Sequence, residues 1–197
     1  MSTQQDTVLQ KLRQLPVDLS LVELYPAEED HAYFCTPLGA RILGRIGVDG
    51  VHFCDVPSLG LDLVFAVTPM GEAPFVYPVA SDLHEFLAEV YTCGSAGSIE
   101  QLIGIAPERA ADFLRFNRAL CIGSDDADEL QQAYDFFGMD GFSLPEPGKN
   151  TAVCHVLNVM ADTFALEPIE DVYAHIQAVC SSFDIKNLSF SDEYDNL

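Results

Sequence analysis

Three short apolar runs followed by one amphipathic stretch give residues 51–91 the most regular hydrophobic pattern in the chain. Each run alternates with the two-residue period of a β-strand, and turn residues separate the runs, which cover residues 51–56, 61–68 and 75–79. The second run is apolar on both faces at its middle, which predicts a central strand. Pro74 and Pro78 cannot donate to a ladder, so we expect the third run to be a short or edge strand.

The amphipathic stretch predicts a helix over residues 82–91 that packs on this sheet. Ser81 is the expected N-cap, with Asp82 in the first turn. Apolar residues recur at the i, i+3, i+4, i+7 and i+8 positions of one buried stripe, namely Leu83, Phe86, Leu87, Val90 and Tyr91. The opposite face is expected to be wet and carries His84, Glu85, Ala88 and Glu89.

Helical spacing dominates most of the remaining chain. We expect a short helix over residues 6–15, while residues 17–25 are compatible with a strand or an irregular segment. The Asp49-Gly50 pair predicts a tight turn before the first strand. A capping box at Ser98 predicts the start of a short helix, and Pro107 predicts the start of another whose outer face carries Arg109, Arg115 and Arg118. Three more helices are expected over residues 124–138, 151–164 and 168–183. The acidic tail over residues 189–197 is expected to fray.

These elements predict an α+β fold in which helices pack on an antiparallel-type sheet and the C-terminal half is mainly helical. The length of 197 residues and a hydrophobic content of 49% suffice for a substantial core. We expect residues 1–97 to form the α+β core. Residues 98–197 are expected to form a helical extension packed on that core as one compact domain.

The net charge of −22 narrows the classes of partner. Binding to nucleic acid or to an anionic membrane needs clustered cations, so neither is expected. The acidity serves solubility or gives an acidic face that docks on a basic protein. The candidate partner-binding residues are Asp125, Asp126, Asp128, Glu129, Glu85 and Glu89. The first four lack the order of residues of an EF-hand loop, and we interpret them as acids that complement the dipole at a helix start.

The six cysteines are spread singly, and no pair has the C-x-x-C spacing. Because the amino terminus lacks the apolar core of a signal peptide and no run is long enough to cross a bilayer, a cytoplasmic protein with reduced thiols is expected.

Two kinds of site chemistry have candidate residues: a zinc site and a cysteine nucleophile. His31, Cys35, His52 and Cys54 supply the donor types of a zinc site, but at spacings unlike a known finger, so core packing is the preferred interpretation. Cys154 and His155 are adjacent, which splays their side chains apart on a helix. Cys93 lies at the negative end of its helix, where the dipole raises a thiol pKa. We therefore expect no catalytic residues, no metal and no cofactor.

The stretches Gly50–Phe53, Leu63–Val67 and Val76–Leu87 together resemble the SUKH superfamily, which includes the SMI1/KNR4 proteins. The similarity covers roughly residues 40–95 and is closest at the final helix. The resemblance implies an α+β domain that binds proteins without catalysis, often as a bacterial immunity protein that neutralises a toxin.

Three functional hypotheses follow. The first is a protein-binding module of this type, with a basic toxin as partner. The second is a structural or regulatory protein that binds through an apolar patch of Phe136, Phe137, Met139 and Phe142. The third is an enzyme, which requires a pocket that gathers His52, Cys54 or paired carboxylates with perturbed pKa values.

Overall fold

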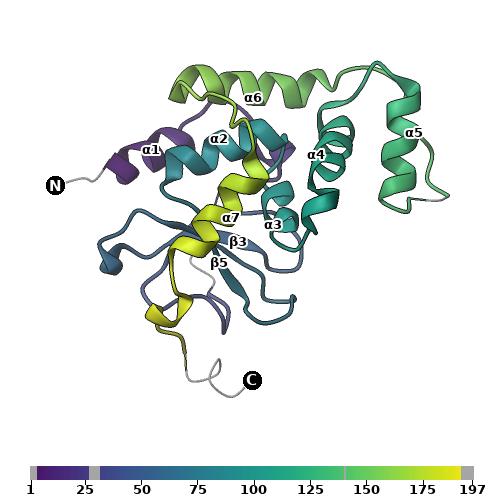
Figure 1. The fold of residues 1–197 in the computed structure, drawn as a ribbon. Helices are drawn as coiled ribbons and strands as arrows, with labels where there is room; N and C mark the ends of the chain where they lie inside the picture. The colour runs from purple at the N-terminus through teal and green to yellow at the C-terminus, as the bar shows by residue number, and fades with distance from the viewer. Residues whose placement is uncertain (1–3, 27–31, 140, 192–197) are drawn as a thin grey trace.

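The computed structural model describes residues 4–26, 32–139 and 141–191, and these form the expected α+β fold (Figure 1). The sheet is antiparallel with the strand order β1-β2-β3-β4-β5. Its strands are β1 (Tyr25–Pro26), β2 (Arg41–Arg45), β3 (His52–Asp55), β4 (Val64–Val67) and β5 (Val76–Ala80). Each strand pairs with the next along the chain, so the sheet is a simple meander.

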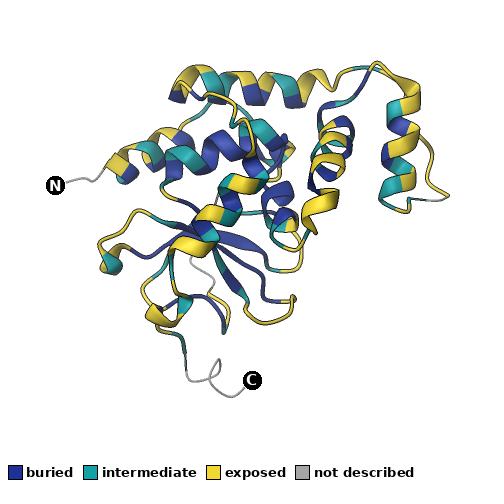
Figure 2. Ribbon diagram, viewed as in Figure 1, coloured by how far each residue is buried: buried dark blue, intermediate teal, exposed yellow. Residues whose placement is uncertain are grey.

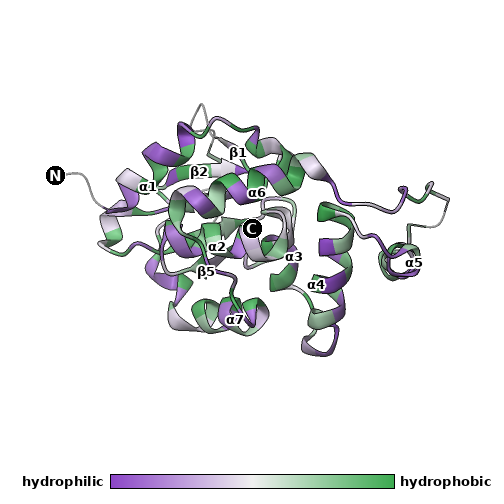
Figure 3. Ribbon diagram, turned by 90° about the horizontal axis from the view of Figure 1, so that it is seen from above, coloured by the Kyte–Doolittle hydropathy of each residue, from purple (hydrophilic) through white to green (hydrophobic). Residues whose placement is uncertain are grey.

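The helices of the described residues are α1 (Gln4–Arg13), α2 (Leu83–Cys93), α3 (Gly97–Ile103), α4 (Pro107–Ile122), α5 (Ala127–Phe136), α6 (Thr151–Phe164) and α7 (Val172–Ser182). Three short 3-10 turns are η1 (Leu19–Val22), η2 (Pro57–Leu59) and η3 (Ile185–Asn187). The view from above places α2 between α6 and α7, with α5 well apart from them (Figure 3).

The predicted strand positions in the sheet are confirmed. All four residues of β4 are fully buried, as expected for a strand covered on both faces, and β5 lies at the edge of the sheet. Pro78 pairs with Phe65 beside an irregularity in the β4–β5 ladder, which accommodates its missing donor. The strand β2 was not among the predicted elements. Its Gly44 lies so close to Leu24 that an added Cβ would meet Leu24 Cδ1 at 2.5 Å.

Hydrophobic clusters fill both faces of the sheet (Figure 2). The larger cluster combines sheet residues such as Phe53 with side chains from both halves of the chain, including Leu9 of α1, Phe86 of α2 and Ile176 of α7. The smaller cluster on the other face contains Cys54 and Phe65 and is closed by Leu188. Residues after position 150 therefore complete the core that the sheet begins.

The helix α2 corrects two predictions. Its N-cap is Asp82, whose carboxylate accepts a hydrogen bond from the Glu85 amide at 2.8 Å, whereas Ser81 lies one residue before the cap. The face expected to be wet is largely covered, because α7 packs across it. Ala88 is 7% exposed and Glu89 is 0% exposed.

Helix boundaries elsewhere follow the sequence with local differences. The expected helix over 151–164 and the start of α4 at Pro107 are confirmed, and Gly138 follows α5 with a φ of 63°. The capping box at Ser98 is wrong: α3 begins at Gly97, and buried Ser98 bonds instead to Ser95 through the two Oγ atoms. Helix α7 begins at Val172, after the N-cap Asp171, and not at residue 168. The open segment 17–25 forms η1 and the start of β1, and residues 192–197 of the tail lie outside the described residues.

Candidate functional site

The candidate acids at positions 125–129 lie at the start of α5 and have different roles there. Asp126 is the N-cap, and its carboxylate accepts from the amides of Asp128 and Glu129 at 2.9 and 3.4 Å. Glu129 accepts a hydrogen bond from the Ser124 hydroxyl. The exposed side chains of Asp125 and Asp128 have no hydrogen bond or ion pair within the described part of the chain. Two carboxylates are thus free for a partner at the positive end of this helix.

The other two candidate acids, Glu85 and Glu89, do not join that surface. They lie on α2 and face α7, and Glu89 is wholly buried. The prediction that Glu89 binds a partner is therefore wrong. Its position follows the helical repeat of the wet face, but the repeat cannot show that a helix some eighty residues later in the chain covers that face.

Glu85 and Glu89 instead form a partly buried cluster with His175 of α7. His175 Nε2 lies 3.2 Å from Glu85 Oε1 and 3.5 Å from Glu89 Oε1. Neither carboxylate oxygen of Glu89 has a hydrogen bond to a described residue. Burial, reinforced by the charge of Glu85, raises the pKa of Glu89 well above its ordinary value. Sequence reasoning missed His175, because no spacing rule links it to α2.

The pKa of Glu85 moves the other way. Burial by itself would raise it, but hydrogen bonds from the hydroxyl and the amide of Ser81, together with nearby His175, hold it below its ordinary value. Oppositely shifted carboxylates are the pattern of acid–base pairs in active sites. Here, however, both oxygens of Glu89 and Nε2 of His175 are inaccessible. Glu89 therefore cannot touch a substrate in this conformation.

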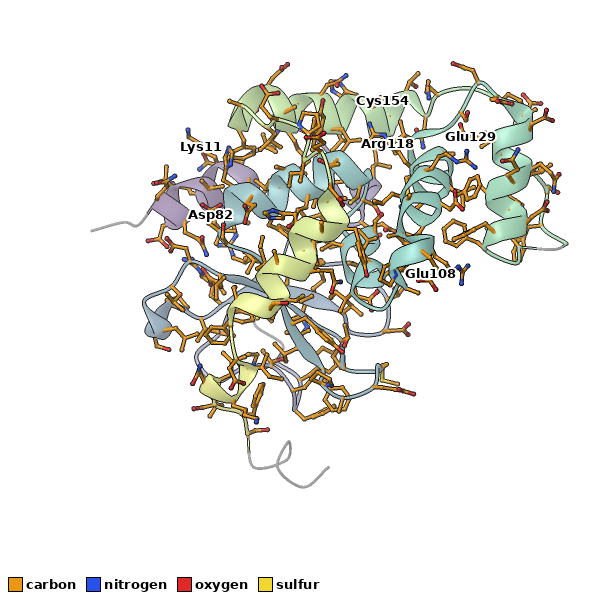
Figure 4. The ribbon with its side chains drawn as sticks, in the orientation of Figure 1. Lys11, Asp82, Glu108, Arg118, Glu129 and Cys154 are labelled. Carbon is orange, nitrogen blue, oxygen red and sulfur yellow. The ribbon has the colours of Figure 1, made fainter. Side chains whose placement is uncertain are left out.

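A groove of approximately 710 Å³ lies beside this cluster, between α4 and the segment that leads into α7. Its lining includes Ala111 and Leu114 of α4 and Ile169, Glu170 and Tyr173 of the opposite wall. An adjoining hollow of approximately 320 Å³ shares Leu114, Ile169 and Glu170 and continues the groove towards Arg118. Figure 4 marks Glu108 and Arg118 near opposite ends of α4, along which the groove runs.

The cations of residues 107–150 are bound within the protein. Arg109 of α4 stacks over the Phe136 ring of α5 at 4.6 Å. Arg115 stacks over Phe116 of its own helix at 4.2 Å and donates to Gln132 of α5, so both arginines help to hold α5 against α4. Arg118 donates to the carbonyl oxygens of Tyr91 and Thr92, and Lys149 donates to that of Gly123. Within the described residues, none of these four cations lies within ion-pair distance of a carboxylate. The acids of this region are therefore not neutralised.

The zinc candidates do not form a site among the residues that can be described. His31 lies outside them, and Cys35 and Cys54 are wholly buried. Both ring nitrogens of buried His52 are engaged, Nδ1 with the Gly50 carbonyl at 2.8 Å and Nε2 with the Thr36 hydroxyl at 3.1 Å. Burial lowers the pKa of His52 to about 4. Over the described ranges, no three His, Cys, Asp or Glu side chains are placed to hold a metal ion together.

The thiol candidates lie far from a nucleophile arrangement. Cys93 is buried, and this burial raises the pKa of its thiol more directly than the helix end that suggested the same direction. His155 is exposed on α6, whereas neighbouring Cys154 is half-buried, as adjacent residues of a helix should be. No described histidine pairs with either thiol.

The proposed apolar patch is smaller than the sequence suggested. Phe136 and Phe137 are half-buried against each other and against Phe116 and Phe113 of α4. Met139 is also half-buried, and Phe142 is 71% exposed. Of the four predicted residues, Phe142 is the one that is fully on the surface. Leu144, which was not among them, is 44% exposed nearby in the chain.

Comparisons with known proteins give no relative: no protein-family model, curated protein or solved structure matches the chain. None of the described helices combines the length and the apolar character needed to cross a membrane.

Proposed function

We propose that this protein is a non-catalytic protein-binding module that neutralises a basic protein, in the manner of a SUKH-type immunity protein. The observation that carries this proposal is the disposition of charge on α4, α5 and the following loop. Residues 107–150 contain nine acidic and four basic residues, and all four bases are held by carbonyl groups or aromatic rings. The acids whose carboxylates make no hydrogen bond or ion pair to a described residue, such as Asp125 and Asp128, remain available to a partner.

This arrangement favours a cationic protein over the other partner classes. Exposed, unpaired carboxylates such as Glu108, Asp112, Asp125 and Asp128 attract cations over the Debye length and repel phosphates. An acidic surface of this kind accelerates encounter with a basic partner such as a nuclease, whose own surface is built to bind phosphate. The order of three strands and a helix over residues 52–93 agrees with the order implied by the SUKH resemblance and supports the same class.

The enzyme hypothesis has less support. His52 and Cys54 are buried in the sheet and do not line an opening together. Of the paired carboxylates with shifted pKa values, Glu89 is wholly buried with both oxygens inaccessible, and Glu85 is held by Ser81 and His175.

The proposal is tested with the protein encoded by the neighbouring reading frame. The chain is expected to bind that protein, to suppress its toxicity in cells, and to lose affinity as salt is raised, because exposed charges are screened. In the double variant Asp125→Asn/Asp128→Asn we expect association to slow by roughly three- to tenfold with little change in dissociation.

The matched control is Asp162→Asn/Glu167→Gln, which removes the same charge from exposed positions on and after α6. It should slow association less than the α5 variant. A neighbouring protein that is not bound, or that is bound equally well at low and high salt, contradicts the proposal.

A further inference from the structure

We propose that the groove between α4 and residues 168–175 holds a short segment of the basic partner, with one or two large apolar side chains beside a lysine or arginine. The class of partner rests on the proposed function. The position of the contact and the chemistry of the bound segment rest on the groove itself.

The floor of the groove consists of apolar side chains that the fold leaves uncovered. Ala111 and Leu114 belong to the apolar stripe of α4, yet Ala111 is exposed and Leu114 is half-buried. On the opposite wall the apolar side chain of Ile169 is only half-buried. Two partly exposed apolar strips therefore face each other across one opening. An apolar side chain of a partner gains free energy by covering both.

The charge at the mouth of the groove favours a cationic residue in the bound segment, next to its apolar residue. Glu170 is exposed and has no hydrogen bond or ion pair to a described residue, and the exposed carboxylate of Asp171 lies next to it as the α7 cap. Arg115 and Arg118 line the adjoining hollow and are bound to Gln132 and to the carbonyls of Tyr91 and Thr92, respectively. His175 lines the groove itself and pairs with Glu85 and Glu89. The carboxylates at the mouth thus lack a counter-charge, and a lysine or arginine of the partner supplies one.

The dimensions of the groove fit a peptide segment. Its volume lies within the range of roughly 300–1,000 Å³ that is usual for binding sites. The eleven-residue rise from Pro107 to Arg118 is about 17 Å of helix, enough for about three turns of a docked helix. A second copy of this chain is a poor occupant, because it carries the same net charge of −22.

The groove and the acids of α5 act at different stages of binding. Asp125 and Asp128 attract the partner at long range, whereas Ala111, Leu114 and Glu170 contact it. Changes in the groove should therefore act mainly on dissociation, which is where most interface mutations act.

The test is selection from a random short-peptide display library on the full chain at low salt. Enriched peptides should combine a large apolar residue with a nearby lysine or arginine. Ala111→Phe, which fills the groove from an exposed helix position, should weaken a fluorescein-labelled enriched peptide by roughly tenfold or more, and Glu170→Gln by roughly threefold or more. Replacing the cation of the peptide by glutamine should remove the effect of Glu170→Gln.

The matched controls are Ala178→Phe, at an exposed position of α7 away from the groove, and Glu167→Gln. Both should leave peptide affinity unchanged. The inference is wrong if no peptide is enriched, if the enriched peptides lack a cation, or if Ala111→Phe leaves their affinity unchanged. If the toxin binds wild type and Ala111→Phe equally, the groove is excluded while the proposed function stands. If peptides bind in the groove but the chain does not neutralise the toxin, the groove remains a peptide-binding site and the proposed function is wrong.

Discussion

Nε2 of His175 on α7 lies 3.5 Å from Oε1 of Glu89 on α2, a carboxyl group that is wholly buried and has no hydrogen bond to a described residue. Glu85, one helical turn before Glu89, lies 3.2 Å from the same nitrogen. The contact between the two helices therefore contains two acids and one histidine where an apolar seam would be more stable.

Replacing Glu89 by glutamine should stabilise the protein at neutral and higher pH. The pKa of Glu89 is raised in the folded state. Its contribution to the free energy of unfolding is therefore fully present below the ordinary pKa of 4.5 and is lost as pH rises through the pKa of the folded state. Glu89→Gln removes this loss, and we expect a gain of about 1–3 kcal/mol in the free energy of unfolding near pH 8. Urea denaturation at several pH values measures it.

The control for this experiment is the exposed Glu108→Gln, which should change stability by less than about 0.5 kcal/mol at every pH. The groups that face Glu89 are Glu85 and Cys93 from α2 and His175 and Cys180 from α7. A destabilised Glu89→Gln near pH 8 would mean that ionised Glu89 forms a net favourable pair with His175.

Asp55 should be one of the most sensitive polar positions in the fold. It is 2% exposed and accepts hydrogen bonds from Arg41 of β2 and, at 2.7 Å, from Gln5 of α1. Because Asp55→Ala leaves the Arg41 guanidinium without its main partner, we expect the free energy of unfolding to fall by about 3–5 kcal/mol. Chemical denaturation measures the change, and the exposed Asp62→Ala is the control. A loss below about 1 kcal/mol would show that α1 is not anchored through Asp55.

His52 should stay neutral in the folded protein until the pH approaches 4. Because burial lowers its pKa, its contribution to stability is present above the ordinary value of 6.5 and is lost as pH falls from there towards about 4. We expect a loss of roughly 3 kcal/mol over this window from His52. The imidazole resonances of His52, assigned with the His52→Gln variant, should show no titration above pH 5. Protonation near 6.5 would contradict the hydrogen-bonded core role.

Native-state alkylation should distinguish the cysteines by burial. Burial raises the pKa of Cys54 and Cys93 thiols and also keeps reagents out. Cys121, Cys154 and Cys180 are half-buried, but burial raises the thiol pKa of Cys121 and of Cys180, so Cys154 should react first. Cys54 and Cys93 should react only at the rate of unfolding. Peptide mass spectrometry after timed iodoacetamide labelling gives the order. Rapid labelling of Cys93 would reopen its candidacy as a nucleophile.

The local pattern of residues determined much of the fold. The run 61–68 has the period of a strand and is apolar on both faces at its middle. This is sufficient to predict a central strand, since such a strand needs cover on both sides. The helix over 151–164 and the start of α4 at Pro107 follow from spacing and capping, which act over a few residues. The charge excess that supports a basic partner is likewise a property of composition.

Only the tertiary structure decided which faces of the predicted elements are buried and which are exposed. Glu89 lies on a face that periodicity assigns to water, and it is buried because α7 returns across α2 from far along the chain. Likewise, apolar Ala111 and Ile169 remain partly exposed, since no other described element covers them where they line the groove. Periodicity reports which side of an element is apolar. Burial depends on which other element packs there, and contacts between distant segments of the chain set that.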